Sequence, residues 1–260
     1  MPTVETTTIA QLSAGQDWRL RLVHDRDHHL LIWITRGQGV GILHGTRRGL
    51  GPHNAIFVPA GFLMSLDVGR QVIGQAVMIS PDTAGQWPEE PQHLRIRDVR
   101  DQATLTAQLE GMAQEASGQL HFHADALAAQ ALLLSVWLQR QIEREPAAPK
   151  PNAAARLSQK FCMNISARYQ SGAPMADYAK ALGVTPTHLT RALKASTGKT
   201  AADLLTERCL HAARTQLLDT QQSAKDIAAG LGFRSAGYFT RFVQHHTGKT
   251  PSDLRARPAR

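Results

Sequence analysis

The spacing of apolar residues changes along the chain and separates a strand-rich beginning from a helical remainder. The stretches HLLIWITRGQGVGILHG (29–45) and NAIFVPAGFLMSLDV (54–68) each hold two apolar runs separated by glycine or proline. Short runs with this punctuation are typical of β-strands joined by tight turns. Residues 1–90 are therefore predicted to form a small β-barrel or sandwich.

Two helices are predicted to follow, at Gln102 to Ala116 and Ala124 to Arg144, because apolar residues recur there at helical spacing. The first contains Leu105, Leu109 and Met112. The apolar stripe of the second is formed by Leu127, Ala131, Leu134, Leu138 and Ile142 and is widened by Leu132, Leu133, Val136 and Trp137. This stripe can pack on the protein's own sheet, or it can form a dimer surface.

The segment EPAAPKPNAA (145–154) holds three prolines among small residues and disfavours both helix and strand. We therefore expect a first domain at 1–144, a linker at 145–154 and a second domain at 155–260. The expected fold class is α+β, with an N-terminal β-barrel bearing helices and an all-α C-terminal domain.

The C-terminal region contains an internal repeat. LTRALKASTGKTAADL (189–204) aligns with FTRFVQHHTGKTPSDL (239–254), and YAKALGVTPTH (178–188) aligns with IAAGLGFRSAGY (227–238) if one residue is inserted after Leu-Gly. Two copies of one structural unit are indicated. TGKT resembles the end of a phosphate-binding loop, but Leu193 and Val243 stand where such a loop requires glycine, so nucleotide binding is disfavoured.

Each copy is predicted to form two helices joined by a tight turn. In the first copy a helix ends at Gly183, Thr185 caps the next helix and Pro186 begins it. In the second copy Gly232 and Ser235 take the corresponding roles. This arrangement is the helix-turn-helix, whose second helix can enter the major groove of DNA.

Charge separates this motif from an ordinary helical hairpin. Residues 152–260 contain 16 Lys and Arg against 6 Asp and Glu, a formal charge of +10, whereas residues 1–151 have a formal charge of −2. A basic domain beside a nearly neutral one indicates a polyanion partner. Double-stranded DNA is therefore the predicted partner.

The stretch DIAAGLGFRSAGYFTRFVQHHTGKTPSDLR (226–255) resembles the signature of AraC/XylS-type bacterial transcription regulators, and the resemblance extends from about Leu157 to Arg255. It implies seven helices, with a connector at Ala201 to Leu218 whose buried side is supplied by Leu204, Leu205, Cys209, Ala212, Ala213 and Leu217. The connector would hold the two recognition helices ~34 Å apart on one duplex. The first copy is most similar to members that respond to aromatic acids.

The family pattern implies base-facing positions on both second helices: Thr187, Thr190, Arg191, Ala236, Gly237, Thr240 and Arg241. Phosphate contacts are expected from Lys199, Arg234 and Lys249. Arg191 and Arg241 suit the guanine edge, although a phosphate contact or a surface salt bridge is the alternative for each. Ala236 and Gly237 offer few hydrogen bonds, so the second motif either reads bases or mainly contacts the backbone.

Residues 18–79 resemble the cupin-like sensor domain that precedes the DNA-binding domain in many family members. A cupin metal centre needs a His-x-His pair, a following carboxylate and a further histidine, whereas His28 and His29 are adjacent and Met64 follows PAGFL. All five histidines of this region, His24, His28, His29, His44 and His53, are expected on the surface or in a polar pocket. No metal, other cofactor or catalytic residue is expected.

Together these features favour a ligand-responsive DNA-binding regulator with an N-terminal effector and dimerisation domain. RNA polymerase is a further partner if the protein is an activator. The alternatives are a cupin-type binding protein or metal enzyme with an accessory basic domain, and a sequence-neutral nucleoid binder. Cys162 and Cys209 are expected to be buried thiols, and the absence of a signal peptide or membrane span predicts a cytoplasmic protein.

Overall fold

A computed structural model of the chain describes residues 4–69, 71–118, 120–146 and 150–256. The chain forms two compact units. The first runs up to Arg21 and from Asp25 to Pro151, and the second contains Leu22–His24 and the chain from Asn152 onward. The division after Pro151 falls in the predicted linker, of which residues 147–149 lie outside the described residues; the domain limits themselves stay predictions.

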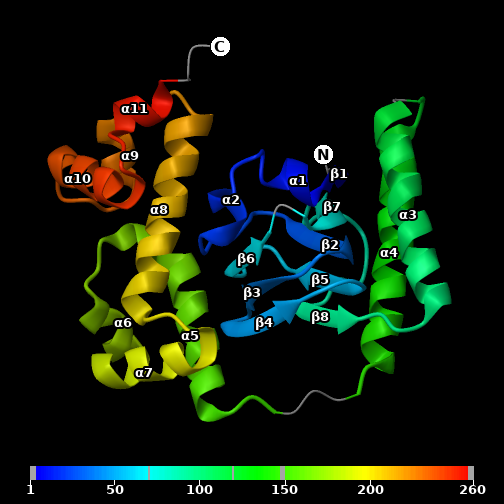
Figure 1. Ribbon diagram of the computed structural model, residues 1–260, viewed down its shortest axis with the longest axis horizontal. Helices are drawn as coiled ribbons and strands as arrows, with labels where there is room; N and C mark the ends of the chain where they lie inside the picture. Colours follow the sequence, from blue (N-terminus) through cyan, green and yellow to red (C-terminus); the bar gives the residue numbers. More distant parts are fainter. Residues whose placement is uncertain (1–3, 70, 119, 147–149, 257–260) are drawn as a thin grey trace. The chain divides into compact units, whose positions relative to one another are not determined.

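The first unit contains eight described strands and four described α-helices (Figure 1). They are β1 (Val4–Thr8), α1 (Ile9–Leu12), α2 (Trp18–Arg21), β2 (His29–Arg36), β3 (Gly39–Leu43), β4 (Thr46–Leu50), β5 (Asn54–Val58), β6 (Met64–Val68), β7 (Ile73–Ile79), β8 (Gln92–Arg95), α3 (Val99–Gly118) and α4 (His123–Arg144). All strand pairs are antiparallel, in one sheet ordered β1-β7-β2-β5-β8 and another ordered β4-β3-β6.

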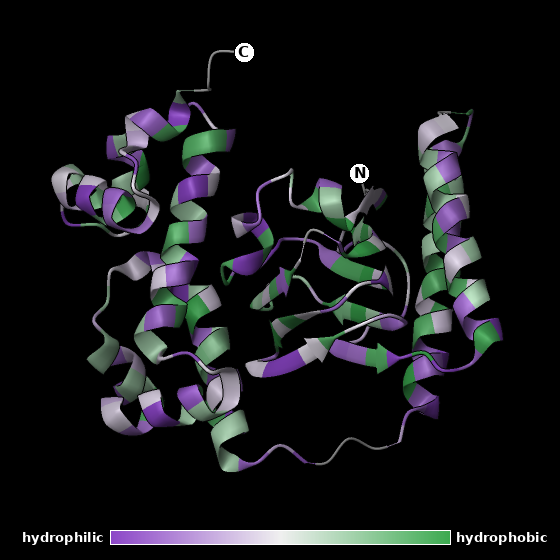
Figure 2. Ribbon diagram, viewed as in Figure 1, coloured by the Kyte–Doolittle hydropathy of each residue, from purple (hydrophilic) through white to green (hydrophobic). Residues whose placement is uncertain are grey.

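Strand β2 lies in the middle of the larger sheet and is buried on both faces, which explains its unbroken apolar run. Leu30, Ile32 and Ile34 pack toward the smaller sheet, while Leu31 and Trp33 pack toward α3 and α4. Hydrophobic residues accordingly dominate β2 and β5 (Figure 2). The predicted β domain with helices is confirmed, but its described strands form two facing sheets and do not close into a barrel.

Most of the apolar stripe on α4 packs against the protein's own sheet. Its members at 127, 131, 134 and 138 share a core with Phe57 and Val77, and Trp137 joins that core. The widening residues face outward, since Leu132, Leu133 and Val136 remain 45%, 61% and 38% exposed. One part of the stripe therefore packs in the core of this unit, and the other part forms an exposed apolar strip.

The second unit is helical, as predicted. Its described elements are α5 (Ala153–Arg168), a 3-10 turn η1 (Tyr169–Ser171), α6 (Met175–Ala181), α7 (Pro186–Thr197), α8 (Ala201–Asp219), α9 (Ala224–Gly230), α10 (Ala236–Thr247) and α11 (Pro251–Arg255). Helix α8 matches the predicted connector, with the α6–α7 pair toward one of its ends and the α9–α10 pair toward the other (Figure 1). The seven α-helices implied by the family resemblance are present in the described part of this unit.

The buried side of α8 differs in part from the expectation. Leu204, Ala212, Ala213 and Leu217 are buried as predicted, but Leu205 and Cys209 are only half-buried, and Arg208 and Leu210 are buried as well. Arg208 can be buried because its guanidinium lies 3.7 Å from the centre of the Tyr169 ring. Both cysteines are free thiols, and burial raises the pKa of Cys162 to about 12 and that of Cys209 to about 11.

The five candidate histidines of the first region have separate local neighbours. These are the Leu22 carbonyl for His24, Asp27 for His28, the Ala60 N–H for His29, Glu90 for His44 and the Trp33 ring for His53. Across the described residues, no three His, Cys, Asp or Glu side chains come together in a group suited to a metal ion. Likewise, none of the helices in the described ranges has the length and apolar character needed to cross a membrane.

Candidate nucleic-acid interface

The first motif follows the predicted chemistry residue by residue. Helix α6 ends before Gly183, whose φ of +68° is the left-handed conformation that glycine adopts readily. Thr185 then caps α7 by accepting a hydrogen bond from the His188 N–H at 3.2 Å, and Pro186 occupies the first turn. The turn is therefore built by local backbone preferences.

Helix α7 presents one apolar face and one polar face. Leu189 and Leu193 are fully buried, which places the opposite face in solvent. That face forms an open, shallow depression of about 730 Å³, lined by Pro186, Thr187, Thr190, Arg191, Lys194 and Ala195. All three base-facing candidates of the first motif therefore lie on one surface. Lys194 was not among the predicted residues, although its position seven residues after Thr187, two helical turns along, indicates the same face.

Arg191 is exposed on this surface, and one of its Nη atoms lies 3.4 Å from Nδ1 of His188. No described carboxylate lies within ion-pair distance of the Arg191 guanidinium. A surface salt bridge, one of the alternatives for this residue, is absent from the described part of the chain. Its guanidinium is free to approach an acceptor on another molecule.

The second motif repeats this construction with one difference. Ser235 caps α10 by accepting a hydrogen bond from the Tyr238 N–H at 3.2 Å, and Phe239 and Val243 are fully buried. The residue that the alignment inserts lies in the turn, which holds Phe233 and Arg234 between Gly232 and the cap. Phe233 donates a backbone hydrogen bond to the Ala228 carbonyl as Val184 does to the Ala179 carbonyl, so Phe233 replaces Val184 and the exposed Arg234 is the added residue. Phe233 packs its ring 5.2 Å from that of Phe239.

The outer face of α10 carries the other candidate base-facing residues. Ala236, Gly237 and Arg241 are exposed and Thr240 is half-buried. A Cβ atom added at Gly237 would meet no neighbouring atom within 4 Å. The protein's own packing therefore does not require glycine at this position.

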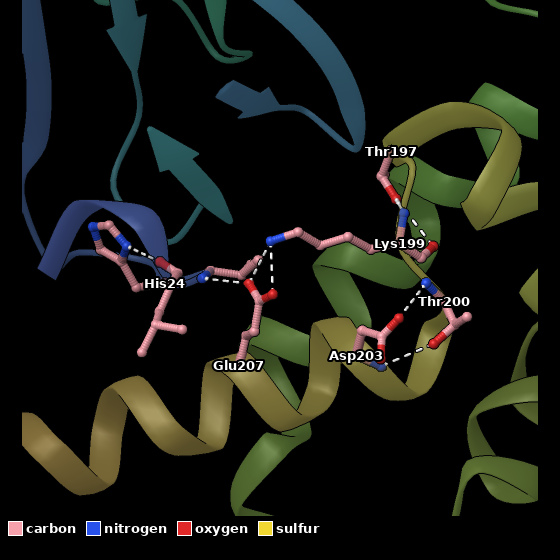
Figure 3. A network of polar contacts seen from close by, with 8 residues as sticks. His24, Thr197, Lys199, Thr200, Asp203 and Glu207 are labelled. Atoms are coloured by element: carbon pink, nitrogen blue, oxygen red, sulfur yellow. Dashed lines mark hydrogen bonds and ion pairs between the residues drawn. The ribbon is translucent and has the colours of Figure 1, made fainter. Parts of the chain in front are cut away.

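The repeated TGKT ends one helix and begins the next. In the first copy Thr197 donates a hydrogen bond to the Leu193 carbonyl and Gly198 adopts φ +79°. Thr200 and Asp203 then form a reciprocal capping box (Figure 3). The second copy repeats all three features, at Thr247, at Gly248 with φ +72°, and at Thr250 with Asp253. The repeat thus has a structural cause, in agreement with the rejection of a nucleotide loop.

The expected phosphate-contacting residues differ in their surroundings. Lys199 is half-buried, and its Nζ lies 2.7 Å from both carboxylate oxygens of Glu207 (Figure 3). Lys249 and Arg234 are exposed, and no described carboxylate lies within ion-pair distance of either. A phosphate would have to displace Glu207 to bind Lys199, whereas it could bind Lys249 or Arg234 without displacing a described carboxylate.

Comparisons with known proteins place residues 178–257 in a family described as a helix-turn-helix domain. The regulatory protein SoxS of Escherichia coli (strain K12) is 34% identical over 79 residues, which cover 30% of this chain and 74% of SoxS. The bifunctional transcriptional activator/DNA repair enzyme AdaA of Bacillus subtilis (strain 168) is 32% identical over 71 residues, or 27% of this chain. That match spans only 34% of AdaA.

Among solved structures, ToxT from Vibrio cholerae O395 aligns over 98% of this chain and 96% of its own, with 12% identity and a TM-score of 0.43. The paired motifs, the connector helix and the match over residues 178–257 define a DNA-binding transcription regulator with tandem helix-turn-helix motifs. The chain belongs to the AraC/XylS-type transcription regulators.

Proposed function

We propose that this regulator binds DNA sequence-specifically, with α7 and α10 entering two adjacent segments of the major groove. One observation carries the proposal: both helices bury an apolar face completely and expose a polar or small-residue face. They do so within the part of the chain that has a formal charge of +10. Buried faces fix each helix in place, and exposed faces are free to contact base edges.

The two motifs are proposed to contribute differently. On α7, Thr187, Thr190 and Arg191 offer several hydrogen-bonding groups, with Lys194 beside them for a phosphate. On α10, Thr240 and Arg241 are the polar residues among the base-facing candidates, and Gly237 allows the backbone to approach the DNA closely. Lys199, Arg234 and Lys249 are proposed to contact phosphates. Because α7 has more polar base-facing residues than α10, it is proposed to supply more of the base discrimination.

The test compares Arg191→Ala and Arg241→Ala on a set of single-base operator variants at two salt concentrations. Loss of a base contact should cost ~1–3 kcal/mol and relax the preference at one base pair, whereas loss of a phosphate contact should weaken all sequences equally. Arg97→Ala is the control for charge, because Arg97 is exposed in the first unit. Equal losses on every operator for Arg191→Ala would contradict its role as a reader.

Scrambled DNA of the same length tests whether the protein binds any sequence. A sequence-specific regulator should bind its operator more tightly than scrambled DNA at matched salt, while a nucleoid binder would bind both alike. A fragment of residues 152–260 should also shift its own promoter at low salt, since both motifs and the positive charge lie within it. No shift by this fragment would contradict the assignment of DNA binding to the helical unit.

The first unit is proposed to bind a small-molecule effector and to form a homodimer. The exposed strip of Leu132, Leu133 and Val136 on α4 supports dimerisation, because three neighbouring aliphatic side chains there face outward. Leu133→Arg should shift the full chain from dimer to monomer in sedimentation at micromolar concentration. Val99→Arg, at an apolar residue 74% exposed on α3, is the matched control. If the wild-type chain sediments as a monomer at micromolar concentration, the proposed dimer is refuted.

The protein is proposed to act by binding and not by catalysis, in the cytoplasm where its DNA partner is found. As an activator it would also contact RNA polymerase. Transcription from its promoter, with and without candidate effectors, distinguishes activation from repression.

A further inference from the structure

A cavity of about 630 Å³ lies beside the second motif, within the helical unit. Its walls come from η1 and the loop after it, from α8, from the turn before α10 and from α10 itself. Cavities of ~300–1,000 Å³ are of the size that encloses small organic ligands. This cavity is therefore large enough for a ligand with one or two rings.

Aromatic side chains form much of the lining. Phe233 lies at the centre of a group, with its ring 5.0 Å from that of Phe242 and 6.0 Å from that of Tyr238. Tyr238 is 55% exposed, an unusual state for a large ring that lines a cavity. Tyr169 contributes from η1, where the guanidinium of Arg208 stacks on it. These rings offer stacking partners for a flat apolar ligand.

The cavity is also positively charged. Arg234 and Arg241 line it, and its lining contains no Asp or Glu among the described residues. Both arginines are exposed, and no carboxylate in the described ranges is within ion-pair distance of them. A guanidinium binds a carboxylate through paired hydrogen bonds, so the site favours an anion.

The wall on the α8 side is apolar, so an anion with a hydrocarbon body fits the cavity better than a simple inorganic anion. Leu205 and Cys209 stand at positions that the helical pattern assigns to the core, yet they are half-buried because they line the cavity. Burial raises the pKa of the Cys209 thiol to about 11, so it stays neutral at pH 7. A phosphate would leave this apolar surface in contact with water, whereas the hydrocarbon body of an organic acid would cover it.

We propose that this cavity binds an aromatic carboxylic acid, with its rings among Phe233, Tyr238 and Phe242 and its carboxylate on Arg234 and Arg241. The same two arginines are expected to contact DNA, so the bound acid competes with DNA at the second motif. The competition rests on the proposed function, whereas binding of the acid does not. The DNA-binding unit would then respond directly to a small molecule.

The first experiment measures binding of biphenyl-4-carboxylate to the full chain by calorimetry, without DNA. A ligand of this size should bind with a dissociation constant of about 1 mM or lower. Biphenyl-4-carboxamide, which lacks the charge, should bind at least ~10-fold more weakly. Equal binding of the acid and the amide would overturn the anion site.

Variants locate the site. Arg241→Gln and Arg234→Gln should each weaken binding of the acid ~10-fold, while Arg97→Gln, in the first unit, should leave it unchanged. Cys209→Phe should block the cavity from the α8 wall, and Leu205→Phe serves the same purpose if Cys209→Phe does not fold, as judged by circular dichroism. Unchanged binding in both arginine variants and in a folded wall variant would overturn the proposal.

The second experiment titrates operator DNA with the full chain in sodium biphenyl-4-carboxylate or in sodium chloride at equal ionic strength. Competition predicts that the apparent dissociation constant for DNA rises linearly with the concentration of the acid, from its value in sodium chloride. If the acid binds but the affinity for DNA does not change, the competition is refuted and the site remains. If the chain does not bind its operator in either salt, the proposed function fails, while the binding result stands.

Discussion

The substitution Gly237→Ala separates the requirements of folding from those of DNA binding. Gly237 lies in the first turn of α10, on its exposed face, and is not among the glycines with positive φ. A Cβ atom there would have no neighbour within 4 Å. The folded protein can therefore accept alanine without strain, and any disadvantage of alanine must come from a partner.

The two effects should have opposite signs. Alanine restricts the unfolded chain, so the free energy of unfolding should rise by roughly 0.4–1 kcal/mol. For a helical unit of this size that corresponds to an increase in melting temperature of roughly 2–8 °C. If the backbone of α10 approaches DNA at this glycine, the added methyl group displaces the helix, and loss of ~1 kcal/mol weakens operator binding about fivefold.

The assays are thermal unfolding and operator titration at fixed salt. Gly230→Ala is the matched control, because Gly230 is also helical, exposed and without neighbours around an added Cβ. It should stabilise the fold and leave DNA affinity unchanged. Wild-type affinity in Gly237→Ala would refute a close approach of DNA at α10, and a loss of stability would refute the account of its packing.

Three further predictions concern the helical unit. Gly172→Ala should lower the free energy of unfolding by about 1–3 kcal/mol in urea titrations, because φ is +64° and a Cβ there would meet the backbone of the turn before α10. Gly183→Ala, where φ is +68° but an added Cβ would have no neighbour, should lower the free energy of unfolding by less. Equal decreases in the two variants would refute the close approach of Gly172 to the turn before α10. Glu207→Gln should free Lys199 for a phosphate, so that DNA binding tightens. The slope of the logarithm of DNA affinity against the logarithm of salt concentration should then steepen by about one unit, and an unchanged slope would exclude that contact. Hydrogen bonds from Thr200 lower the pKa of Asp203 in the folded state, so its stabilisation is present above the unfolded pKa of about 3.9 and is lost as pH falls through the folded pKa. Asp203→Asn should therefore flatten the acid decline in unfolding free energy, and an unaltered decline would contradict this.

The sequence by itself determined the features that depend on residues close together in the chain. Helix caps at Thr185 and Ser235 and the left-handed stops at Gly183 and Gly232 involve partners within four residues, so local chemistry specifies them. The duplication extended this information, because each copy supported the interpretation of the other. The helix-turn-helix family and its two recognition helices followed from these signals.

In the first unit, sequence patterns located the most apolar strands but not the architecture. The polar strand β4 (TRRGL) and the short strands β1 and β8 lack a strong apolar alternation and are held by pairing with distant strands. Whether the strands close into a barrel depends on which edges pair, and no local pattern encodes that choice. The division of the α4 stripe between core and surface likewise depended on where the sheet lies.

Tertiary structure also decided the surroundings of the functional side chains. The base-facing residues stay predictions, but only the structure shows how exposed they are. It also shows that Lys199 forms an ion pair with Glu207, whereas Lys249 has no ion pair among the described residues. The cavity at Tyr169 and Phe233 joins segments more than sixty residues apart, and the approach of Gly172 to Gly232 shapes its wall. Such sites arise from packing between distant segments, and helical periodicity alone would have assigned Leu205 and Cys209 to the core.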